Sequence, residues 1–296
     1  MKIGIDLGGT KTEGILINNS GKELARNRIK TEKNYEGTIQ GVISIVKKFE
    51  NEFGNSESIG VGLPGAVSSE TALVKNANSI WLNGKPFKKD LEKELNRDVN
   101  LENDANCFAL SEAVDGAGKG HAVVFGVIIG TGTGGGIVVN QKVLKGKNNI
   151  AGEWGHVSLP NRSEDEKKYA NQCYCEKSGC METYVSGPGF ANCFNLMHKT
   201  NHDSHTIIEE FNNNEKRAIT ALDNYVDYLA RGLSLVCNIL DPDIIVLGGG
   251  MSNISYIYKN INTALRKNIF SNTFDTKVVR NIHGDSGGVR GAAWLS

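Results

Sequence analysis

The sequence predicts an α/β fold built from two similar domains, and three observations lead to it. Segments typical of strands alternate with segments typical of helices along the chain. A strand, a Gly/Thr-rich turn and a second strand near the N-terminus return in the middle of the chain at a constant offset, so that Gly4, Gly8 and Gly14 align with Gly126, Gly130 and Gly136. The length of 296 residues also suits two domains better than one.

The elements follow in order from apolar periodicity and turn residues. The first half is expected to contain strands at Lys2–Asp6, Gly14–Ile17, Glu23–Lys30, Ser58–Leu63 and Val99–Glu102, with helices at Tyr35–Asn51 and Ala105–Val114. The second half restarts the pattern, with strands at Val123–Ile129, Gly136–Val139, Ile244–Leu247 and Lys277–Asn281 and helices at Arg217–Leu240 and Ile254–Ile269. Asn161–Gln172 is polar and charged, which favours an inserted loop.

The charge balance and the N-terminus exclude several classes of protein. The chain carries 33 basic and 33 acidic residues, which argues against a partner that is a nucleic acid or a membrane surface. Apolar runs such as Ala122–Ile129 are too short to cross a bilayer. Met1–Asp6 leads straight into a strand without a signal-like leader, so we expect a cytoplasmic protein with reduced thiols.

The two Gly/Thr-rich turns are candidates for phosphate binding. Glycines let backbone N–H groups approach phosphate oxygens, threonine hydroxyls add donors, and Lys11 adds positive charge. A single glycine hairpin would more often be structural, but two copies together with Gly248–Gly250 after a buried strand favour a nucleotide. The candidate ATP-binding residues are Gly4, Asp6, Gly8, Gly9, Thr10, Lys11, Gly130, Thr131, Gly132, Thr133, Gly134, Gly135, Gly136 and Gly249.

Two aspartates end strands of the first half, and each has two interpretations. Asp6 beside a phosphate loop is a natural partner for Mg²⁺, and we favour this role over the alternative of a residue that caps a turn. Asp104, in Asn103-Asp104-Ala105-Asn106, lies where a strand gives way to a helix. It could cap the helix, or it could accept the proton of an attacking hydroxyl group. Position alone does not choose between these roles.

A cysteine cluster predicts a structural zinc site. Cys173, Cys175 and Cys180 follow the polar loop, and His156 precedes it. Three thiolates and one imidazole complete a tetrahedral Zn²⁺ set, although Cys-x-Cys is tighter than the usual spacing and reduced free thiols are the alternative. Such a site would also fix Glu153 and Glu182, two carboxylates that suit recognition of sugar hydroxyls and are otherwise surface charges.

These motifs together resemble the ROK family of bacterial sugar kinases and sugar-responsive repressors. The resemblance covers the chain in order and rests on Asp6–Lys11, Glu102–Asn106, Ile129–Gly136, Gly152–His156, Cys173–Cys180 and Leu247–Gly250. It implies the actin-like ATPase (ribonuclease H-like) fold, with two similar domains and an interdomain cleft. The first domain would cover 1–117, completed by a C-terminal helix near 286–296, and the second would cover 118–285 with the zinc-binding insertion.

The resemblance also implies roles for single residues. Asp104 would be the catalytic base, and Asn103, Asp104, Glu153, His156 and Glu182 would bind the sugar. His156, Cys173, Cys175 and Cys180 would bind zinc, and the two glycine turns would hold ATP with Mg²⁺. The family usually has glycine after the second cysteine, where this chain has Glu176, so a turn that needs a positive φ would be strained there. A homodimer is the family expectation.

The prediction is therefore an ATP-dependent hexose kinase. Val74–Phe87 looks most like the manno/fructokinase branch, so the predicted substrate is D-fructose, with D-mannose second, phosphorylated at the 6-hydroxyl. N-acetylglucosamine kinase and glucokinase are the alternatives within the family. A non-enzymatic, sugar-responsive regulator is the remote alternative, because the glycine turn begins too near the start of the sequence to leave room for a DNA-binding domain.

Overall fold

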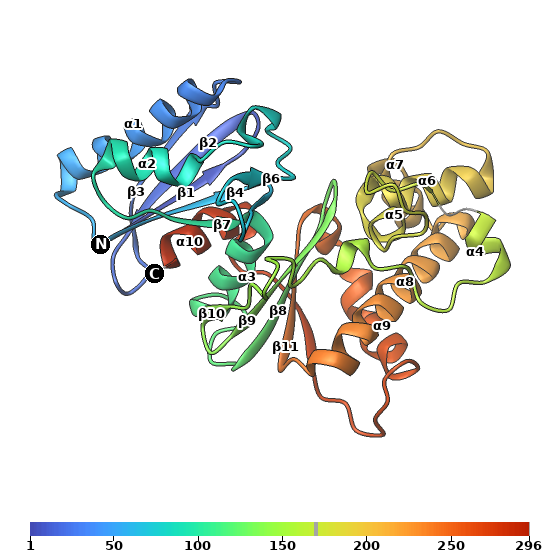
Figure 1. The fold of residues 1–296 in the computed structure, drawn as a ribbon. Coiled ribbons are helices and arrows are strands. Elements are labelled where there is room, and N and C mark those ends of the chain that lie inside the picture. The colour runs from blue at the N-terminus through green and yellow to red at the C-terminus, as the bar shows by residue number, and fades with distance from the viewer. Residues whose placement is uncertain (169–170, 296) are drawn as a thin grey trace. The chain divides into compact units, whose positions relative to one another are not determined.

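The computed structural model describes residues 1–168 and 171–295, which divide into two compact units (Figure 1). Unit 1 comprises Met1–Gly120, Gly136–Ala151 and the C-terminal segment that begins at Ile282. Unit 2 comprises His121–Gly135 and Gly152–Asn281. The domain limits expected from the sequence differ by placing 136–151 in the second domain, and they stay a prediction. None of the helices in the described residues is both long and apolar enough to span a membrane.

Unit 1 is built on a five-stranded sheet in the order β3-β2-β1-β4-β7. β1, β2 and β3 form an antiparallel meander, whereas β4 and β7 run parallel to β1. The strands are β1 (Lys2–Leu7), β2 (Lys11–Ile17), β3 (Glu23–Lys30), β4 (Ser58–Leu63) and β7 (Asn100–Asn103), and a small separate sheet pairs β5 (Ala66–Val67) with β6 (Val74–Lys75). Parallel pairing of β1, β4 and β7 brings their carboxyl ends to one edge of the sheet.

The second sheet repeats this arrangement in the order β10-β9-β8-β11-β12. Its first three strands are again consecutive in the chain, and β11 runs parallel to both β8 and β12. The strands are β8 (Val123–Ile129), β9 (Thr133–Val139), β10 (Lys142–Val143), β11 (Ile244–Gly248) and β12 (Lys277–Arg280). The division between the units falls within β9. The two similar halves predicted from the glycine repeat are thus confirmed in the sheet topology.

Helices cover both faces of the first sheet. α1 (Tyr35–Phe53) and α2 (Phe87–Leu95) share a core with the side chains of Ile3, Ile5 and Leu7. On the other face lie α3 (Asp104–Val114) and α10 (Gly287–Trp294). α10 comes so close that a Cβ at Gly4 or Gly60 would stand 2.2 or 1.9 Å from a backbone oxygen of this helix.

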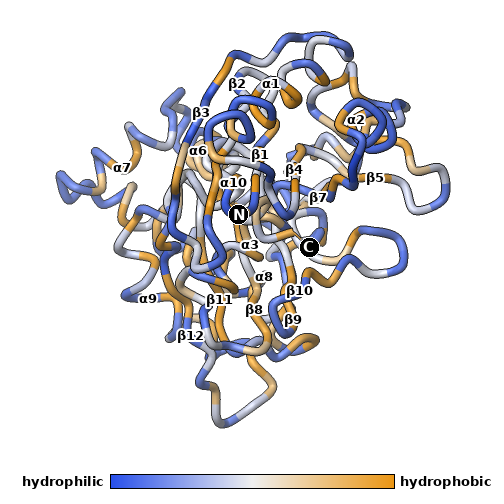
Figure 2. The backbone as a smooth tube through the Cα atoms, turned by 90° about the vertical axis from the view of Figure 1, so that its left-hand side faces the viewer, coloured by the Kyte–Doolittle hydropathy of each residue, from blue (hydrophilic) through white to orange (hydrophobic). Residues whose placement is uncertain are grey.

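Unit 2 adds most of its helices between β9 and β11, and its strands β8 and β11 are hydrophobic along most of their length (Figure 2). The longest helix is amphipathic and buries Leu222, Val226, Leu229 and Leu233 along one side. The helices are α4 (Glu164–Lys168), α5 (Glu182–Val185), α6 (Gly187–His198), α7 (Ser204–Asn212), α8 (Lys216–Leu240) and α9 (Ser255–Arg266). The short 3-10 turns of the chain are η1 (Ile80–Leu82), η2 (Trp154–His156), η3 (Gly250–Asn253) and η4 (Gly284–Ser286).

Several expected element limits need correction. The second strand of each hairpin begins at Lys11 and Thr133, earlier than predicted, because pairing continues to the turn, as the Leu7–Thr12 register shows. The predicted loop Asn161–Gln172 contains the helix α4, and its residues 169–170 lie outside the described part of the chain. The sequence prediction also omitted α2, α6 and α7.

Glu112, near the end of α3, holds two chain segments of unit 1 that lie next to its boundaries. Its side chain is 0% exposed. Oε2 accepts hydrogen bonds from the backbone N–H groups of Ala117 at 2.8 Å and Ile282 at 3.3 Å, and Oε1 accepts one from His283 at 3.4 Å. A buried carboxylate is thereby satisfied by backbone donors, and it fixes where the chain leaves unit 1 and where it returns.

We expect Glu112→Gln to lower the free energy of unfolding by about 2 kcal/mol. The amide offers one oxygen in place of two and turns a donor toward backbone N–H groups, which leaves buried donors without partners. Urea unfolding followed by circular dichroism measures the change, with Glu94→Gln on the exposed face of α2 as the matched control. Equal unfolding midpoints for the two variants would contradict this role of Glu112.

Candidate functional site

The first glycine turn joins β1 to β2 and is shaped by backbone hydrogen bonds. The N–H group of Gly8 donates to the carbonyl oxygen of Lys11 at 3.0 Å. Thr31, just after β3, braces the turn from outside, since its hydroxyl donates to the carbonyl of Gly8 at 2.8 Å and its N–H donates to the carbonyl of Thr10 at 3.1 Å. Gly9 is half-buried, and the tip residues Thr10 and Lys11 are exposed. The turn is therefore rigid and keeps donors at its surface for an anion.

Asp6 and Asp104, also in unit 1, lie close enough to repel each other. The pKa of Asp6 is raised to about 6, chiefly by burial and then by the negative charges of Asp104 and Glu13, while Lys11 acts in the opposite direction. Two carboxylates that destabilise each other's charge, next to a glycine turn, are an arrangement that a divalent cation would relieve.

The helix start at Asn103 separates the two roles that the sequence left open for Asp104. Asn103 is the N-cap of α3, and its Oδ1 accepts from the N–H groups of Ala105 at 2.9 Å and Asn106 at 3.4 Å. Its Nδ2 donates to the carbonyl of Gly65 at 2.9 Å. Asn103 is thus the N-cap, and Asp104 is the first residue of the helix, where its Oδ1 also accepts from the N–H of Ala105 at 2.9 Å. The predicted contact of Asn103 with a sugar stays a prediction.

Glu102, which the sequence analysis did not single out, also stabilises the start of this helix. Its buried carboxylate accepts from the N–H of Asn103 at 2.9 Å and from Nδ2 of Asn106 at 3.0 Å. Its other oxygen lies 2.8 Å from Nζ of Lys145. A buried carboxylate that bonds both the backbone and the side chain of the helix start, with a lysine beside it, fixes the backbone that carries Asp104.

The second glycine turn, in unit 2, is held by different neighbours. The N–H of Gly130 donates to the carbonyl of Gly132 at 2.9 Å, and the N–H of Gly187 at the start of α6 donates to the carbonyl of Gly130 at 2.8 Å. Gly249, at φ +84°, passes so close that a Cβ there would stand 2.6 Å from the carbonyl oxygen of Ile129. Thr131 and Gly132 stay exposed at the tip.

A cavity of about 1000 Å³ opens beside this turn within unit 2. Gly130, Thr131 and the Gly250 end of the glycine run line it together with α6 and α7. Phe211 and Tyr256, also in its lining, meet edge to face with ring centroids 5.1 Å apart. The sequence analysis missed α6 and α7 and with them most of this cavity, whose size and mixed lining suit a nucleoside.

Three of the predicted ATP-binding glycines also have a packing role. Gly4 faces α10, as described above. A Cβ at Gly135 would meet the indole of Trp154 at 2.7 Å and a Cβ at Gly136 would meet the carbonyl of Ala105 at 2.7 Å. Gly134, their neighbour, accepts a hydrogen bond on its carbonyl from Nε1 of Trp154 at 2.9 Å. Inside a β-strand, glycines of this kind mark the close approach of another segment or of a ligand, so the predicted contacts of these glycines with ATP stay a prediction.

The start of β9 is linked directly to the predicted zinc loop. Oε2 of Glu182 accepts a hydrogen bond from the N–H of Thr133 at 3.0 Å, and its Oε1 lies 3.9 Å from Sγ of Cys173. A second link comes from η2, which ends at His156: Nε1 of Trp154, its first residue, donates to the carbonyl of Gly134 in β9. The second glycine turn and the cysteine cluster are therefore one connected piece of unit 2.

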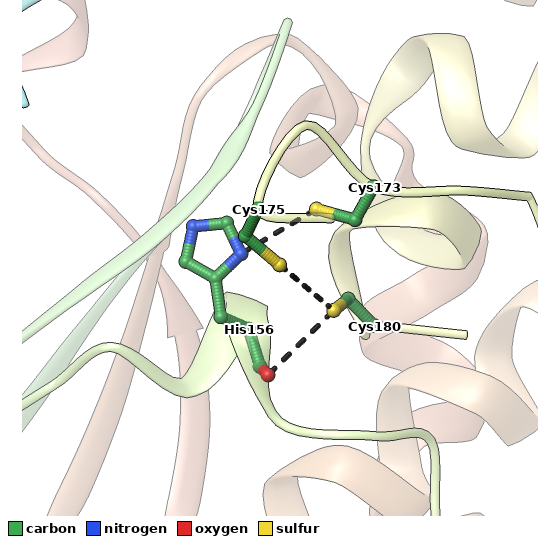
Figure 3. A group of neighbouring side chains, drawn as sticks. All are labelled: His156, Cys173, Cys175 and Cys180. Carbon is green, nitrogen blue, oxygen red and sulfur yellow. Dashed lines mark hydrogen bonds between the residues drawn. The ribbon is translucent and has the colours of Figure 1, made fainter. Parts of the chain in front are cut away.

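His156, Cys173, Cys175 and Cys180 converge as the sequence predicts (Figure 3). One ligand atom from each lies within 4.8 Å of the others. Sγ of Cys173 is 3.5 Å from Nδ1 of His156, and Sγ of Cys175 is 3.5 Å from Sγ of Cys180. A tetrahedral zinc site needs ligand atoms roughly 3.5 to 3.8 Å apart, from Zn–S bonds of ~2.3 Å and Zn–N bonds of ~2.0 Å. The donor set and its spacing fit zinc.

The electrostatics of the thiols also fit a cation. Burial raises the pKa of Cys180 to about 12, and hydrogen bonding and charge from Cys175 and Cys173 act in the same direction. The pKa of Cys173 is also raised, mainly by burial, whereas that of Cys175 is lowered, chiefly by a backbone hydrogen bond from Lys177. Ionisation of Cys173 and Cys180 is therefore disfavoured in the absence of a positive charge, and a divalent metal would remove that penalty.

The two predicted sugar-binding carboxylates lie around the same cluster. Glu153 is exposed at the start of η2, and Glu182 opens α5. Both act on Tyr174, a largely exposed residue: partial desolvation of its hydroxyl oxygen, and then the negative charges of Glu182 and Glu153, raise the pKa of that hydroxyl to about 12. The structure thus groups Glu153, His156 and Glu182 in one region of unit 2.

Residues 2–296 match the sequence model of the ROK family. The chain belongs to the ROK family. Among relatives of this ROK chain is the N-acetyl-D-glucosamine kinase of Vibrio atlanticus, 38% identical over 300 residues, covering 100% of this chain and 99% of that protein. The corresponding kinase of Pectobacterium atrosepticum is 36% identical over 299 residues.

Solved structures agree with this assignment. The ROK hexokinase of Thermus thermophilus superimposes with a TM-score of 0.88 at 27% identity, covering 99% of this chain and 97% of that one. A ROK family glucokinase of Streptomyces griseus, solved with glucose and AMPPNP, gives a TM-score of 0.77 at 26% identity with the same coverage. The ROK chain described here therefore has the actin-like ATPase fold predicted from its sequence.

We expect Asp6→Asn to stabilise this ROK protein above pH 6 in the absence of nucleotide and metal. Because folding raises the pKa of Asp6 from 3.8 to about 6, the unfolded chain releases this proton at a lower pH than the folded chain, so the carboxyl destabilises the fold progressively between about pH 4 and pH 6 and by a constant amount above pH 6. The gain is on the order of 2 kcal/mol at pH 7.5 and vanishes below about pH 4, where the carboxyl is protonated in both states. Thermal unfolding across pH, with exposed Asp98→Asn as control, checks it; a gain that persists at pH 3.5 would refute it.

We expect Glu176→Gly to slow metal loss from the cysteine cluster. Glu176 adopts φ +69°, the left-handed conformation that the sequence analysis identified as a source of strain. Relief of roughly 1 kcal/mol corresponds to about fivefold slower release of zinc to a chelator. Asn214→Gly, at φ +61° in the loop before α8, is the matched control and should release zinc as the wild type does.

Proposed function

We propose that this ROK protein is an ATP-dependent sugar kinase that phosphorylates N-acetyl-D-glucosamine at its 6-hydroxyl. The observation that carries the substrate is identity of 36 to 38% over the full chain to proteins named N-acetyl-D-glucosamine kinase. This favours the alternative that the sequence analysis held beside fructose.

Residues of unit 1 would carry the proton transfer. Asp104 would accept the proton of the attacking sugar hydroxyl, since Asn103 already caps α3 and Glu102 fixes the backbone beneath. Lys11 and the N–H groups of the first turn would bind phosphate oxygens. Asp6, with its raised pKa beside Asp104, is the residue of unit 1 that we propose for Mg²⁺, which supplies charge neutralisation on the phosphates when bound.

Residues of unit 2 would bind the nucleoside, phosphate oxygens and sugar hydroxyls. The cavity beside Gly130 and Thr131 has room for adenosine, and Gly250 and α7 would form its walls. Glu153 and Glu182 would accept hydrogen bonds from sugar hydroxyls, with His156 beside them. Since Glu182 also holds the N–H of Thr133, it ties sugar recognition to the second glycine turn.

We propose that the His156 and cysteine cluster holds a structural Zn²⁺. Four protein ligands would fill the coordination sphere, so the metal would fix the loop and leave no open position for a reactant. A metal bound by these four ligands would explain how a loop with little regular structure could fix the positions of Glu182 and Glu153.

The first experiment is a coupled assay of ADP release with Mg-ATP and four sugars. N-acetyl-D-glucosamine is expected to give the highest kcat/KM, ahead of fructose, mannose and glucose. If fructose gives the highest value, the proposed substrate is wrong and the kinase proposal stands. If no sugar is turned over by zinc-loaded protein, the kinase proposal itself fails.

We expect Asp104→Asn to lower kcat by at least ~10²-fold while the affinity for sugar stays within a few fold, because the amide keeps the shape and loses the base. Steady-state kinetics and calorimetric sugar binding separate the two effects. Asp98→Asn, an exposed aspartate of the same unit, is the control for the substitution itself. Turnover near the wild-type value in Asp104→Asn would remove Asp104 as the base.

A further inference from the structure

His156 uses its two ring nitrogens in different directions. Nδ1 lies 3.5 Å from Sγ of Cys173 and faces the cysteine cluster. The second ring nitrogen lies on the side of the ring away from the cysteines (Figure 3). That nitrogen, Nε2, is 2.8 Å from the hydroxyl oxygen of Tyr174.

Burial of apolar surface does not explain why Tyr174 lies against His156. Its side chain is 78% exposed, so little apolar surface is hidden by holding it against the cluster. Two contacts to His156 account for its orientation: the hydrogen bond to Nε2, and an edge-to-face ring contact with centroids 5.0 Å apart and planes at 87°. Both contacts are made to the imidazole ring of His156.

Tyr174 belongs to the same loop as the three cysteines. Tyr174 lies between Cys173 and Cys175, in a tight turn closed by the N–H of Glu176 donating to the carbonyl of Cys173 at 2.9 Å. The N–H of Cys173 in turn donates to the carbonyl of Lys177 at 2.8 Å. The same backbone therefore sets the cysteines and the phenol, so the hydroxyl reaches His156 when the cysteines are in place.

A histidine that binds a metal through Nδ1 carries its proton on Nε2, and that N–H needs an acceptor. The oxygen of Tyr174 can accept it. Such a bond selects the tautomer with a lone pair on Nδ1 and limits rotation of the ring about its Cβ–Cγ bond.

We propose that Tyr174, in the protein without bound sugar, is a positioning residue that orients His156 toward the metal and slows its release. The inference rests on the zinc site proposed above and concerns a residue that acts through His156. Loss of an outer hydrogen bond of this kind typically lowers metal affinity by ~10- to 100-fold.

The test is Tyr174→Phe in the full chain, which keeps the ring and removes the hydroxyl. Tyr35→Phe is the matched control, since it removes a tyrosine hydroxyl that bonds Asp90 at 2.6 Å in unit 1. Zinc-loaded proteins are mixed with an excess of chromogenic chelator, and zinc release is followed by absorbance. Cobalt-substituted proteins are compared through their visible spectra, which report ligand geometry independently of turnover.

Tyr174→Phe is expected to release zinc at least ~10-fold faster and to shift the cobalt d–d bands, while the thiolate-to-cobalt bands persist. Tyr35→Phe is expected to match the wild type. Equal release from Tyr174→Phe and the wild type would overturn the proposal. A lower KM for sugar with unchanged zinc release would also overturn it, since the hydroxyl would then occupy a place meant for the sugar. A wild-type protein that holds no zinc would remove the metal site and this proposal together, whatever its kinase activity.

Discussion

Backbone contact at glycines is the constraint on which both units depend. In unit 1, Gly4 and Gly60 let α10 approach β1 and β4 within reach of backbone oxygens. In unit 2, the equivalent sheet is approached by η2, where a Cβ at Gly155 would stand 2.1 Å from the carbonyl of Thr133. Any side chain at these positions would push the covering segment outward, and in unit 2 that segment carries His156.

The second effect of this contact is electrostatic. Once the first sheet is sealed by α10, Asp6 sits in surroundings that disfavour its charge, and Asp104 adds a repelling neighbour. The protein keeps this arrangement at the expense of stability, as a site built to receive a cation and phosphates would. Glu112 and Glu102 are different, because their buried oxygens already have protein partners and they act as fixed supports.

The sequence predicted the fold and the cysteine cluster well because both depend on local patterns. Alternating apolar segments and a glycine repeat are sufficient to indicate duplicated sheets, and Cys-x-Cys with a nearby histidine is sufficient to indicate a metal site. Glycine roles were harder, since Gly4 and Gly8 look alike in sequence and differ only in what lies above them. The cavity beside α6 and α7 was missed for the same reason, because its walls come from distant segments.

The segment Val74–Phe87 explains why the substrate was the least secure prediction. Trp81 donates its indole N–H to the hydroxyl of Thr38 on α1 at 2.9 Å. Asn83 bonds both the N–H and the carbonyl of Ala77 with its side-chain amide, and Phe87 is fully buried in the core. The residues that make this segment distinctive thus serve to fold it against unit 1. A likeness in such residues reports shared packing, which kinases of different sugars can have in common, and discrimination among hexoses must come from residues that touch the sugar.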